Sequence, residues 1–276
     1  MNRLMKSSDL EALKSLWHQV FGDPADFAQT AIGKFAGEQN VFVCEADGAP
    51  IAMLLAVPVT MKGEKGAYFY GLATQVEWRG QGKMTALMQY AKEILAQRGC
   101  RFVTLIPAGA DLFGYYQARG FEKAFALRTL KREIQRNLWA QAEFDSVTAK
   151  ALLSLRETYC PSAVMLPLSQ MMVVLGNLYA QGITIVSSKG GYGLYTRKGK
   201  TLCFLEMQAE NDRAAERLME AAREKEVFAE EAVITVGANQ TLFLGEGVAT
   251  EYGMVCFLGE RMDLFDGYMR LMLDNE

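Results

Sequence analysis

The sequence has 276 residues, which is long for one compact domain and enough for two. Half of the residues are apolar and 22% are charged, the balance of an ordinary soluble globular protein. The net charge of −3 argues against a general nucleic-acid-binding protein, which usually carries a basic surplus. No uninterrupted apolar run is long enough to span a bilayer, which argues against a membrane protein.

The five cysteines include no C-x-x-C pair, and most of them lie within or beside apolar runs. This pattern is typical of buried thiols in a reducing compartment. The first ten residues are interspersed with polar and charged residues and lack the apolar core of a secretion signal. The sequence therefore predicts a cytoplasmic protein, monomer or homodimer, with no metal, nucleic-acid or membrane partner.

Helical and strand-like patterns alternate through the first half of the chain. Apolar residues at helical spacing predict a helix over residues 8–20, which ends before Pro24. Strands are expected at residues 41–46 and 51–59, joined by the hairpin turn Asp47-Gly48. The elements expected next are a strand at 67–76, a helix from about Met84 to Gly99, a strand at 102–106, a short helix at 111–119 and a strand at 121–130. This order predicts an α/β or α+β unit.

A polar, charged stretch at residues 131–145 is the expected linker, and it gives domains at 1–135 and 136–276. Beyond it the order of a strand meander followed by a long helix occurs again, which we interpret as a weak structural repeat. The elements expected here are helices at 148–159 and 168–180, strands at 183–187, 192–196 and 201–207, a helix including 214–222, and strands at 232–236, 241–244 and 252–258.

The turn after Val76 carries the clearest chemical signal of the sequence, Arg79-Gly80-Gln81-Gly82-Lys83-Met84. Gly80 and Gly82 leave the backbone without Cβ atoms where a strand turns into a helix. Successive N–H groups can then point at one anion, and the helix N-terminus adds partial positive charge. Arg79 supplies a full charge nearby. The pattern suits a pyrophosphate, although the two glycines alone favour a simple turn that joins the strand to the helix.

The surroundings of this turn resemble the cofactor motif of the GNAT superfamily of N-acetyltransferases. In that motif a strand ends in a bulge, and an R-x-x-G-x-G/A loop opens a long helix. Arg79, Gly80 and Gly82 match the loop, whereas Met84 stands where the family usually has Gly or Ala. Because the contact made at this position is through a backbone N–H, the match survives the larger side chain.

A second, independent match lies downstream. A strand and a short helix lead into Tyr116-Gln117-Ala118-Arg119-Gly120-Phe121, which resembles the family's closing Y-x-x-x-G-F signature. The two motifs together cover about residues 41–130. From residue 139 onward the resemblance is only to the general layout of tandem GNAT proteins, distantly like the enhanced-intracellular-survival acetyltransferases.

The resemblance implies an α/β (α+β) fold of two GNAT-like domains, each a mixed, mostly antiparallel sheet flanked by helices. It implies acyl transfer, with acetyl as the expected group, from acetyl-CoA to a primary amine by direct attack. Tyr116 would act as the general acid. The strand edge would pair with the pantetheine, and a backbone N–H would polarise the thioester carbonyl. The cofactor-binding residues that it implies are Leu72, Ala73, Thr74, Arg79, Gly80, Gln81, Gly82, Lys83, Met84 and Thr85.

Two alternatives to an acyltransferase stay open on the sequence. One is a catalytically silent acyl-CoA-binding sensor or scaffold, and the other is a structural partner whose loop binds no nucleotide. The acceptor, a small-molecule or peptide amine, is not specified by any motif. Four acidic residues are possible general bases, and no spacing selects among Asp23, Asp26, Glu38 and Glu45.

Three other features favour structural interpretations. The single histidine, His18, lies on the first helix away from both motifs. Aromatic residues 68–70 on the third strand are expected in the core. The second strand-to-helix junction, residues 205–213, contains no glycine and places Glu210 and Asp212 at the helix start. Because like charge would meet a pyrophosphate there, we expect coenzyme A to bind in the first domain only.

Overall fold

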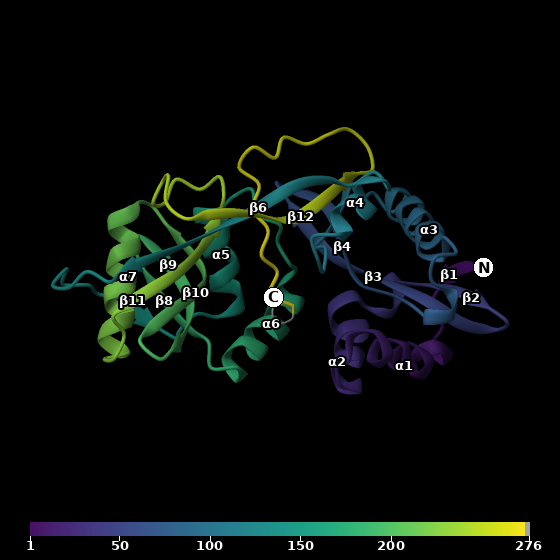
Figure 1. The fold of residues 1–276 in the computed structure, drawn as a ribbon, viewed down its shortest axis with the longest axis horizontal. Helices are drawn as coiled ribbons and strands as arrows, with labels where there is room; N and C mark the ends of the chain where they lie inside the picture. The colour runs from purple at the N-terminus through teal and green to yellow at the C-terminus, as the bar shows by residue number, and fades with distance from the viewer. Residues whose placement is uncertain (274–276) are drawn as a thin grey trace. The chain divides into compact units, whose positions relative to one another are not determined.

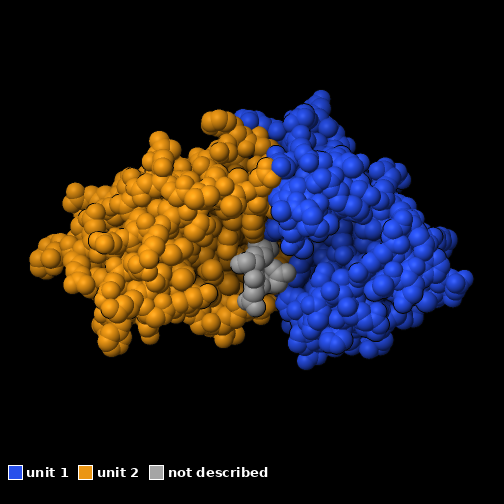
Figure 2. All heavy atoms as spheres, in the orientation of Figure 1, with its two compact units in different colours: residues 1–123, 253–263 blue, residues 124–252, 264–276 orange. Residues whose placement is uncertain are grey.

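The computed structural model describes residues 1–273. The chain divides into two compact units: unit 1 comprises Met1–Lys123 and Gly253–Asp263, and unit 2 comprises Ala124–Tyr252 and Leu264–Glu276 (Figure 2). Strands β6 (Glu122–Glu133) and β12 (Val248–Phe257) each begin in one unit and end in the other. The expected linker therefore does not separate two self-contained sheets. The assignment of domains at 1–135 and 136–276 stays a prediction.

Unit 1 is built on a mixed sheet whose strands follow the order β1-β2-β3-β4-β5-β12 (Figure 1). All neighbours are antiparallel except β4 and β5, which are parallel. The expected mixed, mostly antiparallel α+β organisation is confirmed in this unit. The strands other than β12 are β1 (Asn2–Leu4), β2 (Val41–Ala46), β3 (Ala49–Met61), β4 (Glu64–Thr74) and β5 (Phe102–Leu105).

Helices cover both faces of this sheet (Figure 1). Neighbouring strand residues point to opposite faces: Phe69 packs in the core with α3, whereas Tyr70 contacts Trp17 of α1. The aromatic run at 68–70 is buried, so its expected place in the core is confirmed. The helices and helical turns of unit 1 are η1 (Ser7–Asp9), α1 (Leu10–Phe21), α2 (Ala25–Thr30), η2 (Ala31–Ala36), η3 (Glu38–Asn40), η4 (Val76–Trp78), α3 (Lys83–Gln97) and α4 (Leu112–Gln117).

Helix α2 and the helical turns η2, η3 and η4 were not expected from the sequence. The first helix ends at Phe21, before Pro24 as expected, with Gly22 as its left-handed C-cap at φ = +79°. Pro24 is the residue immediately before α2. Proline is favoured at helix starts because its missing N–H is not needed there and its φ angle is already helical.

Unit 2 has strands in the order β6-β11-β10-β9-β8-β7, with β10 and β11 parallel and the other neighbours antiparallel. The order of elements repeats that of unit 1: a meander, a helix and a parallel strand. The elements of unit 2 besides β6 and β12 are β7 (Glu143–Phe144), α5 (Ala149–Tyr159), α6 (Leu168–Ala180), β8 (Thr184–Ser188), β9 (Gly191–Lys198), β10 (Thr201–Ala209), α7 (Asp212–Lys225) and β11 (Glu231–Gly237).

Two expectations for the last part of the chain are wrong. Residues 241–244 form turns and not a strand. The cause is the buried guanidinium of Arg128, which donates to the carbonyl oxygens of Gln240, Leu242, Phe243 and Glu246 and so curls the segment around itself. The strand expected at 252–258 does form, as β12. Its residues Met254–Phe257 pair with β5 of unit 1, however, and do not complete the second half.

Candidate functional site

A bulge interrupts strand β4 shortly before its end. The pairs Leu55–Tyr70 and Met53–Ala73 enclose one residue on β3 but two, Gly71 and Leu72, on β4. Gly71 has φ = +59°, and a Cβ atom there would lie 2.4 Å from the ring of Trp17. Only glycine therefore allows both the backbone turn and the packing of the indole on the bulge.

Beyond the bulge, β4 has an open edge. The parallel ladder between β4 and β5 begins at Gly66 and ends at the pair Tyr68–Thr104, whereas β4 continues to Thr74. Over residues 69–74 no described strand pairs with β4 on the side of β5. Three of the predicted cofactor-binding residues, Leu72, Ala73 and Thr74, lie on this stretch, where an extended ligand can be added as a further strand.

The loop that follows is braced by its own side chains. Arg79 Nε donates to the Thr74 carbonyl oxygen at 3.1 Å, and Gln81 Nε2 donates to the Glu77 carbonyl oxygen at 2.9 Å. Gly80 and Gly82 have φ angles of +75° and +72°. A Cβ atom at either glycine would have no neighbour within 4 Å, so the space in front of the loop is open.

The N-terminus of α3 emerges from this loop without a cap. Gly82 has no side chain to accept from the first N–H groups, and the first helical turn contains no acidic residue. Orphan N–H groups and the helix dipole make such a terminus an anion site. Lys83 adds a charge, held over the Trp78 ring at 5.1 Å. Met84 packs its side chain against the core of unit 1, which explains why this position tolerates a residue larger than Gly or Ala.

These features fit the diphosphate of an acyl-CoA. The bare backbone at Gly80 and Gly82 admits close approach, and the donors that face outward are the N–H groups of the first turn of α3. Thr85, at the third position of this turn, is half-buried. The residues expected to bind the cofactor thus lie on one continuous stretch, the end of β4, the loop and the start of α3.

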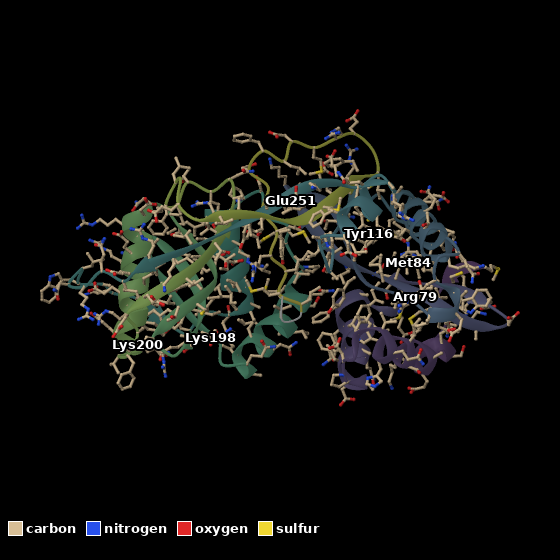
Figure 3. The ribbon with its side chains drawn as sticks, in the orientation of Figure 1. Arg79, Met84, Tyr116, Lys198, Lys200 and Glu251 are labelled. Atoms are coloured by element: carbon tan, nitrogen blue, oxygen red, sulfur yellow. The ribbon has the colours of Figure 1, made fainter. Side chains whose placement is uncertain are left out.

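Tyr116 lies on α4, with its side chain 8% exposed. Its ring packs edge-on against Tyr115 and Phe121, with ring centroids 5.2 and 5.8 Å away. Burial, with a smaller contribution from Tyr115, raises the pKa of Tyr116 to about 12. Its hydroxyl therefore stays protonated throughout the neutral range and can donate a hydrogen bond. Figure 3 shows Tyr116 in the same unit as Arg79 and Met84.

Arg119 is a residue that the sequence analysis did not select. Its Nε donates to Thr85 Oγ1 at 2.8 Å, and its Nη1 donates to the Tyr115 carbonyl oxygen at 2.6 Å. The guanidinium also stacks on the Tyr115 ring, 3.4 Å from its centroid. The available signal was its spacing from Tyr115, because Arg119 lies in the turn after α4, four residues after Tyr115.

The acidic candidates for a general base are mostly engaged elsewhere. Asp23 accepts from Trp17 Nε1 at 2.9 Å, and Glu45 is paired with Arg3 at 2.6 Å. Glu38 accepts from the Ser7 hydroxyl, whereas Asp26 is exposed. His18 is exposed, and its Nδ1 lies 2.9 Å from a carbonyl oxygen, in keeping with the structural interpretation.

Residues 2–124 match the family model described as an acetyltransferase (GNAT) domain. The sequence has no significant match among curated proteins. Similar solved structures include a probable N-acyltransferase from Enterococcus faecalis, with 14% identity over 94% of this chain and 72% of that chain, and a TM-score of 0.74. A GCN5-related N-acetyltransferase from Kribbella flavida has 16% identity over 92% and 70% of the two chains, and a TM-score of 0.72. Eis1 from Mycobacterium abscessus has 13% identity over 94% and 74%, and a TM-score of 0.67.

The segment 2–124 is therefore a GNAT-family acetyltransferase domain, and the resemblance stated from the motifs is confirmed. At identities of 13–16% the solved structures show the fold alone. A GNAT fold implies an acyl-CoA cosubstrate, in agreement with the fit of the loop to a diphosphate. Among residues 1–273 no helix is long and apolar enough to cross a membrane.

Proposed function

We propose that this protein is an acyl-CoA-dependent N-acyltransferase, which transfers an acetyl group from acetyl-CoA to a primary amine. The observation that carries the proposal is the uncapped N-terminus of α3, which follows two glycines with positive φ and adjoins the open edge of β4. The first N–H groups of a helix have no acceptor within the helix, and here no capping side chain supplies one, so they are available to an anion.

In the proposed reaction the amine attacks the thioester carbon, the C–S bond breaks and coenzyme A leaves as a thiolate. Tyr116 donates a proton to that sulfur, and the attacking amine loses one proton, so the number of protons is conserved. Leu72 and Thr74 on the edge of β4 would pair with the pantetheine amides, and the N–H near Ala73 would polarise the thioester carbonyl. The diphosphate would be held by the loop and the first turn of α3, which are Arg79, Gly80, Gln81, Gly82, Lys83, Met84 and Thr85.

We propose further that unit 2 is a degenerate GNAT-like domain without a cofactor site. This proposal is supported by the repeated order of meander, helix and parallel strand. A bulge in β10, at the place that corresponds to the bulge in β4, supports it too. The pairs Phe204–Tyr195 and Glu206–Leu194 enclose Leu205 of β10 and no residue of β9.

The alternative is a catalytically silent sensor or scaffold that binds acyl-CoA. The presence of Tyr116 together with an intact loop favours catalysis, because a protein that only binds needs no group to protonate a thiolate. In the third class, a structural partner, the loop would bind no nucleotide at all. These classes differ in two measurements, the binding of coenzyme A and its release from acetyl-CoA.

A screen of primary amines with acetyl-CoA, read by release of free coenzyme A, tests the proposal. With an acceptor in hand, Tyr116→Phe should lower turnover by roughly 10²–10⁴-fold and leave acetyl-CoA affinity nearly unchanged. Tyr90→Phe, which removes a hydroxyl from the half-buried face of α3, is the matched control and should leave turnover as it is. Binding of coenzyme A with no amine acetylated would identify a sensor. Absence of any coenzyme A thermal shift would identify a structural partner.

A further inference from the structure

Arg119 joins two elements that the proposed reaction uses separately. The residue follows α4, the helix of Tyr116, and its Nε donates to Thr85 Oγ1 in the first turn of α3. Lys92 Nζ donates to the Arg119 carbonyl oxygen at 2.7 Å and fixes the backbone of the same residue. The end of α4 is thus attached to α3 by both the side chain and the main chain of Arg119.

The guanidinium of Arg119 is held in place before any ligand arrives. One face stacks on the Tyr115 ring, Nη1 donates to the Tyr115 carbonyl, and Nε donates to Thr85. A planar donor fixed at three points loses little conformational freedom when it acts on an anion. No acidic side chain among the described residues forms an ion pair with it within 4.0 Å, so its charge is not neutralised locally.

The contact also sets the direction of the Thr85 hydroxyl. Because Thr85 Oγ1 accepts from Arg119 Nε, its own proton is left to be donated elsewhere. Thr85 is the third residue after Gly82, so this proton lies in the same turn as the uncapped N–H groups of α3. A donor that accepts from a cation is polarised and becomes a stronger donor.

We propose that Arg119 is a positioning residue of the diphosphate site, which orients and polarises the Thr85 hydroxyl toward a diphosphate oxygen of acyl-CoA and adds its positive charge to the N-terminus of α3. The inference rests on the proposed function and adds a residue to its binding site. Through the same contact, binding of the diphosphate is coupled to the helix that bears Tyr116.

The test is calorimetric titration of the full chain with coenzyme A. Arg119→Gln and Thr85→Val should each weaken binding about 10-fold, as expected for the loss of one charge-assisted hydrogen bond. The double variant should lose less binding free energy than the sum of the two single variants, because both single variants remove the same hydrogen bond. Arg119→Lys keeps the positive charge but lacks the planar guanidinium with its several donors. Its affinity for coenzyme A should lie between those of Arg119→Gln and the unmodified protein. Pantetheine, measured by competition and lacking the diphosphate, should bind all variants alike.

The matched control is Arg98→Gln at the opposite end of α3. Arg98 Nη1 donates to the Gln39 carbonyl oxygen and to Asn40 Oδ1, and its removal takes an equal charge from the far end of α3. Its coenzyme A affinity should equal that of the unmodified protein. If Arg119→Gln also binds coenzyme A normally, or loses coenzyme A and pantetheine equally, the inference is wrong. If the unmodified chain binds no coenzyme A, it is the proposed function that fails.

Discussion

Helices α3 and α7 start in the same structural setting, but they differ in the capping and charge of their first turns. Each follows the bulged third strand of a meander and leads into a strand parallel to it. At the start of α3, Gly82 leaves the first turn uncapped. At the start of α7, Asn211 Oδ1 accepts from the Ala214 N–H at 3.0 Å. Asp212 places a carboxylate in the first turn, and its Oδ1 accepts from the Phe243 N–H at 2.7 Å.

The difference teaches that the layout by itself does not make a ligand site. In unit 2 the Ala214 N–H already has an acceptor in Asn211, and the Asp212 carboxylate would repel a phosphate. The segment 240–246 is anchored by Arg128 and lies against the start of α7 through the Asp212 contact. In unit 1 the corresponding donors have no acceptor from the first turn itself.

The strands before the two helices also carry different residues. Beyond its bulge, β4 has Ala73 and Thr74. At the same place β10 has Glu206, which is fully buried. The carboxylate of Glu206 accepts two bonds from Arg156, at 3.0 and 2.8 Å, and one each from the hydroxyls of Tyr192 and Tyr268. A charged network of this kind fills the face of the strand with structural contacts.

The largest effect is expected from breaking this network. Arg156→Met leaves the Glu206 carboxylate buried without its cation, which should lower the free energy of unfolding by about 3–5 kcal/mol. Adding Glu206→Gln should recover part of the loss, because the charge is then removed as well. Chemical denaturation of the full chain measures both. Arg197→Met, at a half-exposed ion pair with Glu226, is the control and should cost about 1 kcal/mol or less. Equal losses for Arg156→Met and Arg197→Met would contradict the interpretation.

The second largest effect expected is a loss of affinity for coenzyme A when the start of α3 is blocked. Gly82→Val places a branched side chain where the diphosphate approaches, and should weaken binding about 100-fold or more in calorimetry. Because a single site is expected, the variant should lose all binding and not half of it. Gly99→Val introduces valine at a similar φ, +82°, and into similarly open space at the other end of α3. This control carries the same backbone strain and should bind normally. Two sites per chain, or a Gly82→Val chain that retains one, would show that α7 also binds.

Local patterns in the sequence predicted most of the elements, because they depend on nearby residues. The helix expected at 168–180 and the strand at 41–46 form with those bounds. The turn Asp47-Gly48 has both φ angles positive, as its hairpin type requires. The wrong strand at 241–244 shows the limit of this approach, because the apolar run is curled by Arg128, a residue more than a hundred positions away.

The candidate site was predictable where glycine or a motif marks the backbone, and not where side chains meet across elements. Gly80 and Gly82 could be recognised from the sequence, because two glycines in a strand-to-helix turn indicate a backbone without Cβ atoms at that point. The contact between Arg119 and Thr85 joins residues 34 positions apart and has no local signature. The pairing of β12 with β5 is likewise a long-range choice, since an apolar strand pattern does not name its partner.

The buried tyrosines of the two units provide a smaller, pH-dependent comparison. Tyr116 has a folded-state pKa of about 12 against about 10 when unfolded. The folded state therefore holds its proton more tightly, so stability is fully present below pH 10 and falls as the pH rises toward 12. The contribution is at most about 2.7 kcal/mol. Tyr116→Phe should make this alkaline loss smaller in denaturation curves, while the part due to Tyr192 and Tyr268 stays. An unchanged alkaline loss would mean that Tyr116 is not protected by burial.

The smallest effect tests the cap of α7 directly. Asn211→Ala removes the acceptor for the Ala214 N–H and should lower the free energy of unfolding by about 1 kcal/mol, whereas Asn211→Gly should cost only a few tenths. Asn211→Gly also gives α7 a glycine where α3 has Gly82. If a bare helix start were sufficient, this variant would bind a second coenzyme A. We expect no second site in calorimetry, because Asp212 still presents its carboxylate and holds the Phe243 N–H. A second binding event in Asn211→Gly would show that the cap alone, and not the charge of Asp212 and the turn it holds, keeps unit 2 from binding.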